Sequence, residues 1–408
     1  MKKRVFRSAL VALIAIMVVG LITPGAAQAI QPANTETPAA PPSGQGIAVS
    51  LGDSYISGEA GRWAGNSSST AQVDALGRSA YWDAGNREST PRCHRASSAE
   101  IFYAGPGSAV NLACSGSRVN TRTDSSGNFK PGLDFYNDGR GNIGQVLALQ
   151  ELAGQRRVNT IAVQIGGNDF NFGSIVSNCV TKFLTSSSWA PRYCKDDPSV
   201  QGNFTRANIS SVTEGIATGL RNIRTAMTNA GYASGDYRII VQNYPQPLPT
   251  SDRMAYGQFG YSRQSTYGCG FWNADLDWAA KSALPQINNA VRNGYQAAGL
   301  TNASFLDISG LFAGKELCAQ GTKKLNDTSL ASWRSPGASD VSEWISEIRT
   351  VSTAYSEYYI QESLHPNYWG QLALRGCLRQ AAGTASDSRC LPAGNGLTPA
   401  GEPRVRLG

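Results

Sequence analysis

The chain has 408 residues, 41% of them hydrophobic and 16% charged, so it can form one large globular domain or two smaller ones. Its formal net charge is +7, but four basic residues lie among the first seven positions, and the remaining chain carries about +3. A charge this small and this scattered argues against nucleic acid as a partner.

The N-terminus has the pattern of a secretory signal peptide. A basic start is followed by an apolar run over residues 9–22 and by the small-residue motif Ala27-Gln28-Ala29. The alternative is a membrane anchor, but the run is shorter than the roughly 20 residues that a membrane-spanning helix needs. We therefore expect residues 1–29 to be cleaved, which makes the mature protein secreted and extracellular, with no stable membrane anchor.

The eight cysteines are expected to form disulfides because an exported protein meets an oxidising environment. Pairing each cysteine with its neighbour along the chain is the simplest connectivity, and it closes loops short enough to pin surface segments. A zinc site is the rival interpretation, but the chain has no C-x-x-C motif and only two histidines. The predicted pairs are Cys93–Cys114, Cys179–Cys194, Cys269–Cys318 and Cys377–Cys390.

Apolar runs alternate with helical stretches between two irregular ends. Residues 30–46 are rich in proline and alanine and predict a flexible linker, and the tail 391–408 also has an irregular composition. Between them, strand–helix alternation predicts one α/β domain over residues 47–390, with a central parallel sheet of about five strands between helical layers. The predicted strands are 47–51, 109–114, 160–165, 238–244 and 303–308; the predicted helices are 143–154, 212–231, 276–299 with a kink or break at Pro285, and 368–383.

Three polar, glycine-rich turns follow the first three predicted strands. They read GDS at 52–54, CSGS at 114–117 and GGND at 166–169. Because the chemistry of a parallel α/β sheet lies at the carboxyl ends of its strands, we expect these turns to meet at one edge.

Ser54 in the first turn is a candidate nucleophile, although a serine at this place is more often a turn residue or a helix cap. A serine hydroxyl needs a base. His94 lies between arginines, which disfavour a protonated imidazole, whereas His365 lies on a loop at the entrance of a helix. Gly116 and Asn168 could donate hydrogen bonds to an oxyanion, but each turn alone reads equally well as a structural turn.

Taken together, the blocks resemble the SGNH, or GDSL, hydrolase family. Ser54 stands in GDSY, Gly116 in CSG, Asn168 in GGND and His365 in SLHPN. The resemblance spans nearly all of residues 46–385 and is strongest to extracellular bacterial esterases and lipases. It implies a flavodoxin-like, three-layer α/β/α fold and ester hydrolysis through an acyl-serine. In that case Ser54 is the nucleophile and His365 the base. The Ser54 N–H, the Gly116 N–H and the Asn168 amide are the oxyanion donors, and no cofactor or metal is needed.

One position departs from the family pattern D-x-x-H. Glu362 stands where the aspartate would orient the histidine, and glutamate is one methylene longer. Some extracellular relatives use instead a backbone carbonyl two residues before the histidine, which here belongs to Ser363. We include Glu362 among the candidate catalytic residues but favour the Ser363 carbonyl as the group that holds His365 in the required tautomer.

Three functions fit the sequence. The first is a secreted serine esterase or lipase, the second a carbohydrate esterase that deacylates a polysaccharide, and the third a non-catalytic glycan- or wall-binding protein. Aromatic residues in 58–93 (Trp63, Tyr81, Trp82) and in 266–278 (Phe271, Trp272, Trp278) either line a substrate cleft or pack as a small core. We expect a monomer that acts on a small-molecule, lipid or glycan ester.

Overall fold

The computed structural model describes residues 40–81, 90–350 and 357–408. The predicted signal peptide, linker residues 30–39 and Trp82 lie outside the described residues. Residues 40–46, the rest of the predicted linker, have no regular secondary structure.

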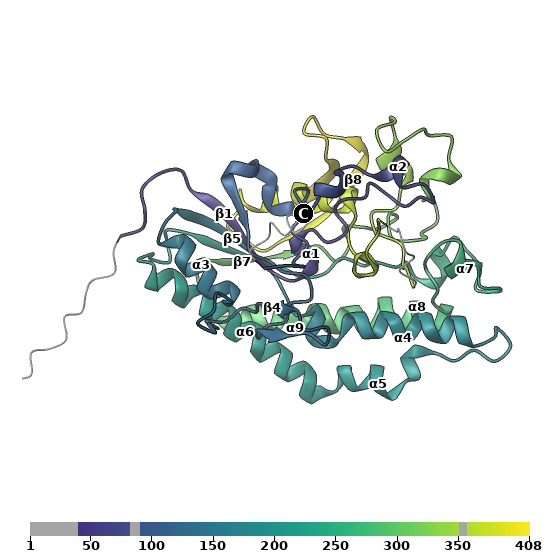
Figure 1. Ribbon diagram of the computed structural model, residues 1–408, viewed down its shortest axis with the longest axis horizontal. Coiled ribbons are helices and arrows are strands. Elements are labelled where there is room, and N and C mark those ends of the chain that lie inside the picture. The colour runs from purple at the N-terminus through teal and green to yellow at the C-terminus, as the bar shows by residue number, and fades with distance from the viewer. Residues whose placement is uncertain (1–39, 82–89, 351–356) are drawn as a thin grey trace, which may run out of the picture. The chain divides into compact units, whose positions relative to one another are not determined.

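A parallel sheet organises the domain, as the sequence predicts (Figure 1). Its first five strands lie in the order β2-β1-β5-β6-β7, which is the 2-1-3-4-5 order of flavodoxin-like folds. β1 pairs with β2 on one side and with β5 on the other, so the strand order reverses at β1. The strands are β1 (Ile47–Gly52), β2 (Ala109–Asn111), β5 (Val158–Gln164), β6 (Arg238–Gln242) and β7 (Ala303–Asp307).

Alternate residues of the strands build two cores. On one face, Ile161 and Val163 pack against α3 (Gln145–Ala153), α6 (Arg206–Asn229) and α9 (Leu284–Ala298). These helices run along one side of the sheet (Figure 1). On the other face, Ala162 and Ile240 pack with α1 (Ser54–Ser57) and α11 (Tyr368–Ala381). The predicted three-layer α/β/α fold is therefore confirmed.

The remaining elements are short, apart from α4. The helices are α2 (Thr70–Val73), α4 (Phe172–Thr185), α5 (Pro198–Gln201), α7 (Ser262–Ser265), α8 (Asn273–Trp278) and α10 (Ala338–Val341), and β3 (Arg122–Thr123) pairs with β4 (Phe129–Lys130).

The break predicted at Pro285 is a π-helical segment. Residues Ala279–Ala283 form η8, which joins α8 to α9, and Pro285 stands in the first turn of α9. Proline has no N–H for the preceding turn, and a local π-helical turn accommodates this without ending the helical course.

The prediction that residues 391–408 form an irregular tail is wrong. Residues Ser388–Leu397 form β8, which pairs parallel with β7, and Pro403–Leu407 form β9, which pairs antiparallel with β8. The sheet therefore has seven strands rather than about five. The proline- and glycine-rich composition hid these strands, because such residues are tolerated at a sheet edge and at a bulge, as at the register shift after Pro392.

All four predicted disulfides are confirmed, with Cys93–Cys114, Cys179–Cys194, Cys269–Cys318 and Cys377–Cys390 bonded. Within the described residues, no helix has the length and apolar character needed to cross a membrane.

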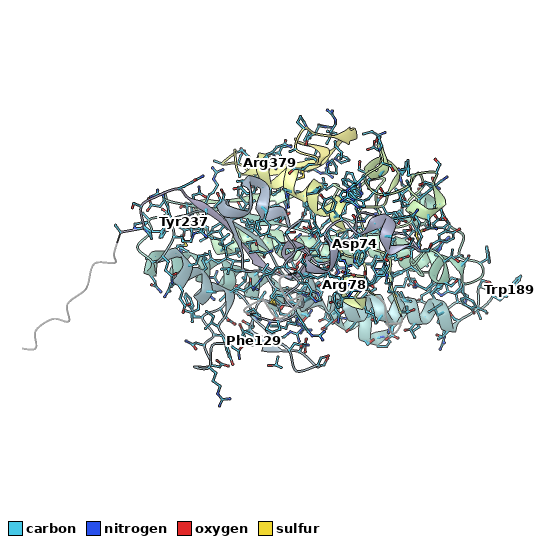
Figure 2. All side chains as sticks on the ribbon, turned by 45° about the horizontal axis from the view of Figure 1, so that its top comes forward. Asp74, Arg78, Phe129, Trp189, Tyr237 and Arg379 are labelled. Carbon is cyan, nitrogen blue, oxygen red and sulfur yellow. A yellow bond between two sulfur atoms is a disulfide. The ribbon has the colours of Figure 1, made fainter. Side chains whose placement is uncertain are left out.

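The aromatic residues of the segment after Ser54 pack inward. Trp63 is 1% exposed and joins Val73, Leu325 and Ala338 in a third small core. Arg62 in the same segment is paired with Asp74, so this segment is tied to itself as well as to the domain. Trp189, by contrast, projects from the domain (Figure 2), and 95% of its surface is exposed.

Candidate active site

Ser54 sits on a tight turn at the carboxyl end of β1. Gly52 has a φ of +137°, and a Cβ atom there would lie 1.9 Å from the Gln164 carbonyl oxygen of β5, so only glycine fits. Asp53 is the N-cap of α1, because its side chain accepts a hydrogen bond of 3.1 Å from the Tyr55 N–H. Ser54 is therefore not the cap, and its hydroxyl is available for another partner.

The Gln145 side chain, at the start of α3, holds this turn by hydrogen bonds to both backbone groups of Gly52. Its Oε1 accepts from the Gly52 N–H at 2.7 Å, and its Nε2 donates to the Gly52 carbonyl at 2.9 Å. The same Nε2 donates to Pro131 at 2.8 Å. Sequence analysis did not single out Gln145, since a glutamine at the start of a helix carries no motif.

His365 is the histidine that the fold brings to Ser54. Its Nε2 lies 2.6 Å from Ser54 Oγ, and its Nδ1 lies 3.0 Å from the Ser363 carbonyl oxygen. A carbonyl oxygen can only accept, so Nδ1 carries the proton, which leaves Nε2 free to accept the serine O–H. His94 lies elsewhere, with its Nδ1 2.7 Å from Glu59.

Ser54 and His365 are both buried, and burial shifts the pKa of His365. Ser54 is 6% and His365 8% exposed. Burial lowers the pKa of His365 below its ordinary value of 6.5, while the Glu59 charge and the Ser363 carbonyl act in the opposite direction. The imidazole is therefore neutral, and able to accept a proton, at neutral pH.

Glu362 does not reach the imidazole; its carboxylate is fully buried and is occupied by other donors. Oε1 accepts from Tyr81 at 2.5 Å, and Oε2 accepts from Trp63 Nε1 at 2.9 Å and from the Tyr359 N–H at 3.0 Å. Glu362 thus anchors the turn η10 (Ile360–Glu362), and the carbonyl that faces Nδ1 belongs to the next residue, Ser363. The geometry agrees with the hypothesis that the Ser363 carbonyl orients the imidazole. Glu362, a candidate catalytic residue from the sequence, does not contact His365.

Gly116 and Asn168 complete the cluster. Both line one cavity with Ser54 and His365. Asn168 Nδ2 donates one hydrogen to the Ser117 carbonyl at 2.9 Å, which leaves its second hydrogen for a ligand. Gly116 has a φ of +78°, and a side chain there would press on Lys130 at 3.2 Å, so the turn that carries its N–H suits glycine.

A hydrogen-bonded chain links the serine turn to the turn of Asn168. Tyr244 donates to Asp53 Oδ2 at 2.5 Å and accepts from the Gly167 N–H at 2.9 Å. Burial raises the pKa of Asp53 to about 7, although the hydrogen bonds from Tyr244 and from the Tyr55 N–H act to lower it. Tyr244 therefore couples the positions of Ser54 and Asn168, a role that only the folded structure reveals.

Two cavities meet at Ser54 and Asn168. The first, of about 80 Å³, is a narrow apolar slot that runs between α4 and the α8–η8–α9 course. The second, of about 510 Å³, carries polar side chains beside Gly116 and His365. The slot is lined by Phe172, Ile175, Phe204, Leu248, Phe271, Trp278, Ala279, Ala280, Ala283, Leu284 and Ile287, among others. Of the predicted aromatic residues, Phe271 and Trp278 line the slot, whereas Trp272 packs on Phe183 at 4.8 Å.

Comparisons with known proteins give several similar solved structures. No protein-family model and no curated protein sequence matches the chain. The extracellular lipase of Streptomyces rimosus is 18% identical, with a TM-score of 0.42 over 82% of this chain and 99% of that one. Phospholipase A1 of Streptomyces albidoflavus NA297 is 18% identical, with a TM-score of 0.40 over 83% and 99%. Est24, a carbohydrate acetylesterase of Sinorhizobium meliloti, is 11% identical, with a TM-score of 0.29 over 65% and 87%.

Burial of His365 predicts a measurable titration shift. In a histidine NMR titration we expect the pKa of His365 to lie below 6.5, with the proton of the neutral ring on Nδ1. The chain has two histidines, so the His94→Gln variant assigns the signals. A pKa at or above 6.5 in the wild type would contradict the buried environment described above.

Removal of the Glu362 carboxylate is expected to destabilise the turn without changing the imidazole tautomer. Glu362→Ala leaves three donors without their acceptor, and we expect the free energy of unfolding to fall by about 3 kcal/mol or more. Glu362→Gln, which keeps one acceptor oxygen, should lose less. Denaturant unfolding measures both. A switch of the neutral ring to Nε2–H in Glu362→Gln would show that Glu362, rather than the Ser363 carbonyl, fixes the tautomer.

Proposed function

We propose that this chain is a secreted serine esterase of the lipase type, which hydrolyses carboxylic esters through an acyl-serine intermediate. The observation that carries the proposal is the Ser54–His365 hydrogen bond of 2.6 Å at the junction of an apolar slot and a wider cavity that carries both polar and apolar side chains. The four blocks shared with SGNH hydrolases support the same reaction. The signal-peptide pattern and the four disulfides support secretion.

The reaction follows from the roles we assign. Ser54 Oγ attacks the ester carbonyl carbon while its proton passes to His365 Nε2, so that an imidazolium and a tetrahedral oxyanion form together. The Ser54 and Gly116 N–H groups and the Asn168 amide stabilise the oxyanion. The imidazolium then gives its proton to the leaving alcohol oxygen as the carbon–oxygen bond breaks. Water repeats the sequence on the acyl-serine and releases the acid.

The shape of the two cavities favours an apolar acyl chain over a small acetyl group. The slot that begins at Ser54 is lined almost wholly by aliphatic and aromatic side chains, which suits an extended hydrocarbon chain. The wider cavity carries Ser115, Ser177, Thr181 and Gln361, which suits a polar alcohol. A carbohydrate esterase is the second candidate, because the polar side chains of the wider cavity could bind a sugar. A non-catalytic binding protein has no need of the Ser54–His365 pair.

Hydrolysis of p-nitrophenyl esters from acetate to palmitate tests the proposal. We expect the mature chain from residue 30 to cleave esters of medium or long acyl chains, and Ser54→Ala to lose activity by a factor of about 10⁴ or more. Failure of the wild type on every ester would reject the esterase function. A preference for acetate alone would favour the carbohydrate esterase.

A bulky residue in the wall of the slot should shorten the accepted chain. The Asn288 side chain accepts from the Tyr244 N–H at 2.9 Å, so this part of α9, with Ile287 in the slot wall, lies near the serine turn. Ala280 also lines the slot, about two helical turns earlier in the same course. We therefore place Ala280 further from Ser54 than Ile287. We expect Ala280→Phe to cut kcat/KM for palmitate by about tenfold or more, since the slot would be filled, while acetate hydrolysis changes little. Lys281→Phe, on the exposed side of the same segment, is the matched control. Equal losses for both esters would argue against the slot as the acyl site.

A further inference from the structure

A buried ion pair lies behind the candidate active site and has no part in the reaction outlined above. Glu59 is 0% and His94 2% exposed, and His94 Nδ1 lies 2.7 Å from Glu59 Oε1. The imidazole stacks against the ring of Tyr81, at 4.9 Å, and against that of Tyr359, at 5.2 Å, and these two rings also contact each other at 6.1 Å. Removing two charged groups from water is costly, and apolar residues of similar size often serve stability as well. A buried pair at this place therefore points to a role in the site.

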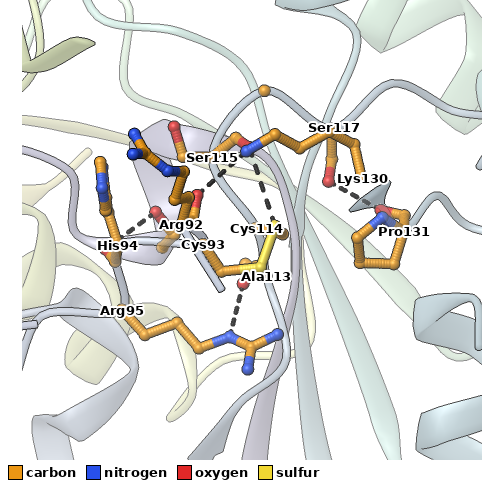
Figure 3. Close-up of a disulfide and its surroundings, with 12 residues drawn as sticks. Arg92, Cys93, His94, Arg95, Ala113, Cys114, Ser115, Ser117, Lys130 and Pro131 are labelled. Atoms are coloured by element: carbon orange, nitrogen blue, oxygen red, sulfur yellow. Dashed lines mark hydrogen bonds between the residues drawn. A yellow bond between two sulfur atoms is a disulfide. The ribbon is translucent and has the colours of Figure 1, made fainter. Parts of the chain in front are cut away.

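The backbone ties this pair to the serine and to the oxyanion turn. The Glu59 N–H donates to the Ser54 carbonyl at 3.1 Å, at the end of α1. The Cys93–Cys114 disulfide joins the two segments that carry His94 and Ser115, and the Ser115 N–H donates to the Cys93 carbonyl at 3.0 Å (Figure 3). The backbone therefore connects Glu59 to Ser54, and it connects the segment of His94 to the turn that carries Gly116.

The charges of the pair act on His365 in opposite directions. Burial alone would raise the pKa of Glu59, but the charge of His94 and its hydrogen bond, the charge of His365 and a hydrogen bond from Ser115 together lower it to about 2, so the carboxylate is ionised at working pH. Glu59 raises the pKa of His365 and His94 lowers it, the Glu59 effect being the larger. In the described part of the chain, other titratable groups lie around these residues. Tyr55 lies beside His365, Tyr81 and Tyr359 lie on His94, and the Glu59 charge acts to raise the pKa values of Lys130 and Glu362.

We propose that Glu59 and His94 are positioning residues for the Ser54–His365 pair, with Glu59 supplying the negative charge that stabilises the His365 imidazolium and His94 limiting that effect. The inference rests on the proposed function. A triad acid both orients the imidazole and balances its charge. Here the Ser363 carbonyl orients the ring, and the charge comes from Glu59 without a direct hydrogen bond to His365. His94 keeps the carboxylate ionised in its buried place.

The test measures the pKa of His365 by NMR in four proteins: the wild type, Glu59→Gln, His94→Gln and the double variant. Glu59→Gln should lower this pKa because the favourable charge is lost. His94→Gln should raise it because Glu59 then acts alone. The double variant should lie between Glu59→Gln and the wild type. The acid limb of kcat/KM should move in the same directions, and kcat of Glu59→Gln should fall about tenfold with little change in KM, as for a loss confined to the transition state.

A purely structural role gives a different pattern. It would lower activity in both single variants, with no opposite shifts of the His365 pKa, and that result would overturn the proposal. Circular dichroism and Tm check the fold first, because each single change leaves a buried group without its partner. Should only the double variant fold, a His365 pKa equal to that of the wild type would overturn the proposal, and a lower one would support it. The NMR measurement does not depend on turnover, so a wild type without esterase activity rejects the proposed function separately.

Discussion

The hydrogen bond between Ser54 and His365 joins residues 311 positions apart in the sequence, so it forms only when the fold brings both residues together. Ser54 is held by the first strand of the sheet, and His365 stands before its last long helix. The geometry of a contact between residues so far apart in the sequence is only as precise as the elements that position them. The turn after β1 is fixed by Gly52, Asp53 and the Gln145 side chain. On the other side, the His365 backbone carbonyl accepts from the Ser346 N–H at 2.9 Å, and its N–H donates to the Glu362 carbonyl at 3.2 Å.

In many serine hydrolases an aspartate both orients the imidazole and balances the charge of the imidazolium. In the candidate site, no single carboxylate of the described residues contacts His365 to perform both tasks. Orientation of the imidazole falls to a backbone carbonyl, which cannot be lost by mutation of a side chain. The position of that carbonyl depends in turn on Glu362, a buried carboxylate with three donors. The acidic residue three positions before the histidine thus serves the geometry of the turn, which explains why glutamate is accommodated there.

Sequence reasoning worked best where the signal is local. The five apolar runs, the cysteine neighbours and the polar turns at strand ends each depend on a few adjacent residues, and the parallel sheet then brings the turns together. It failed for β8 and β9, whose glycines and prolines conceal strands that exist because β7 offers a partner. It also could not find Gln145, Tyr244 or the Glu59–His94 pair. Their partners lie far along the chain, and a lone glutamine, tyrosine or glutamate has no distinguishing pattern. The slot is narrow because the small side chains of Ala279, Ala280 and Ala283 face large side chains from other elements, such as Phe172 and Phe204. Composition does not reveal such a shape.

The two outer strands of the sheet differ from its interior in a way that bears on association. β2 is only three residues long, and β9 carries a proline and the exposed side chains of Arg404 and Arg406. Short strands, prolines and like charges are the features that prevent a sheet from adding strands of another molecule along its open edge. The domain thus closes off, at both margins, the most direct route by which copies of the chain could fuse their sheets or aggregate at high concentration.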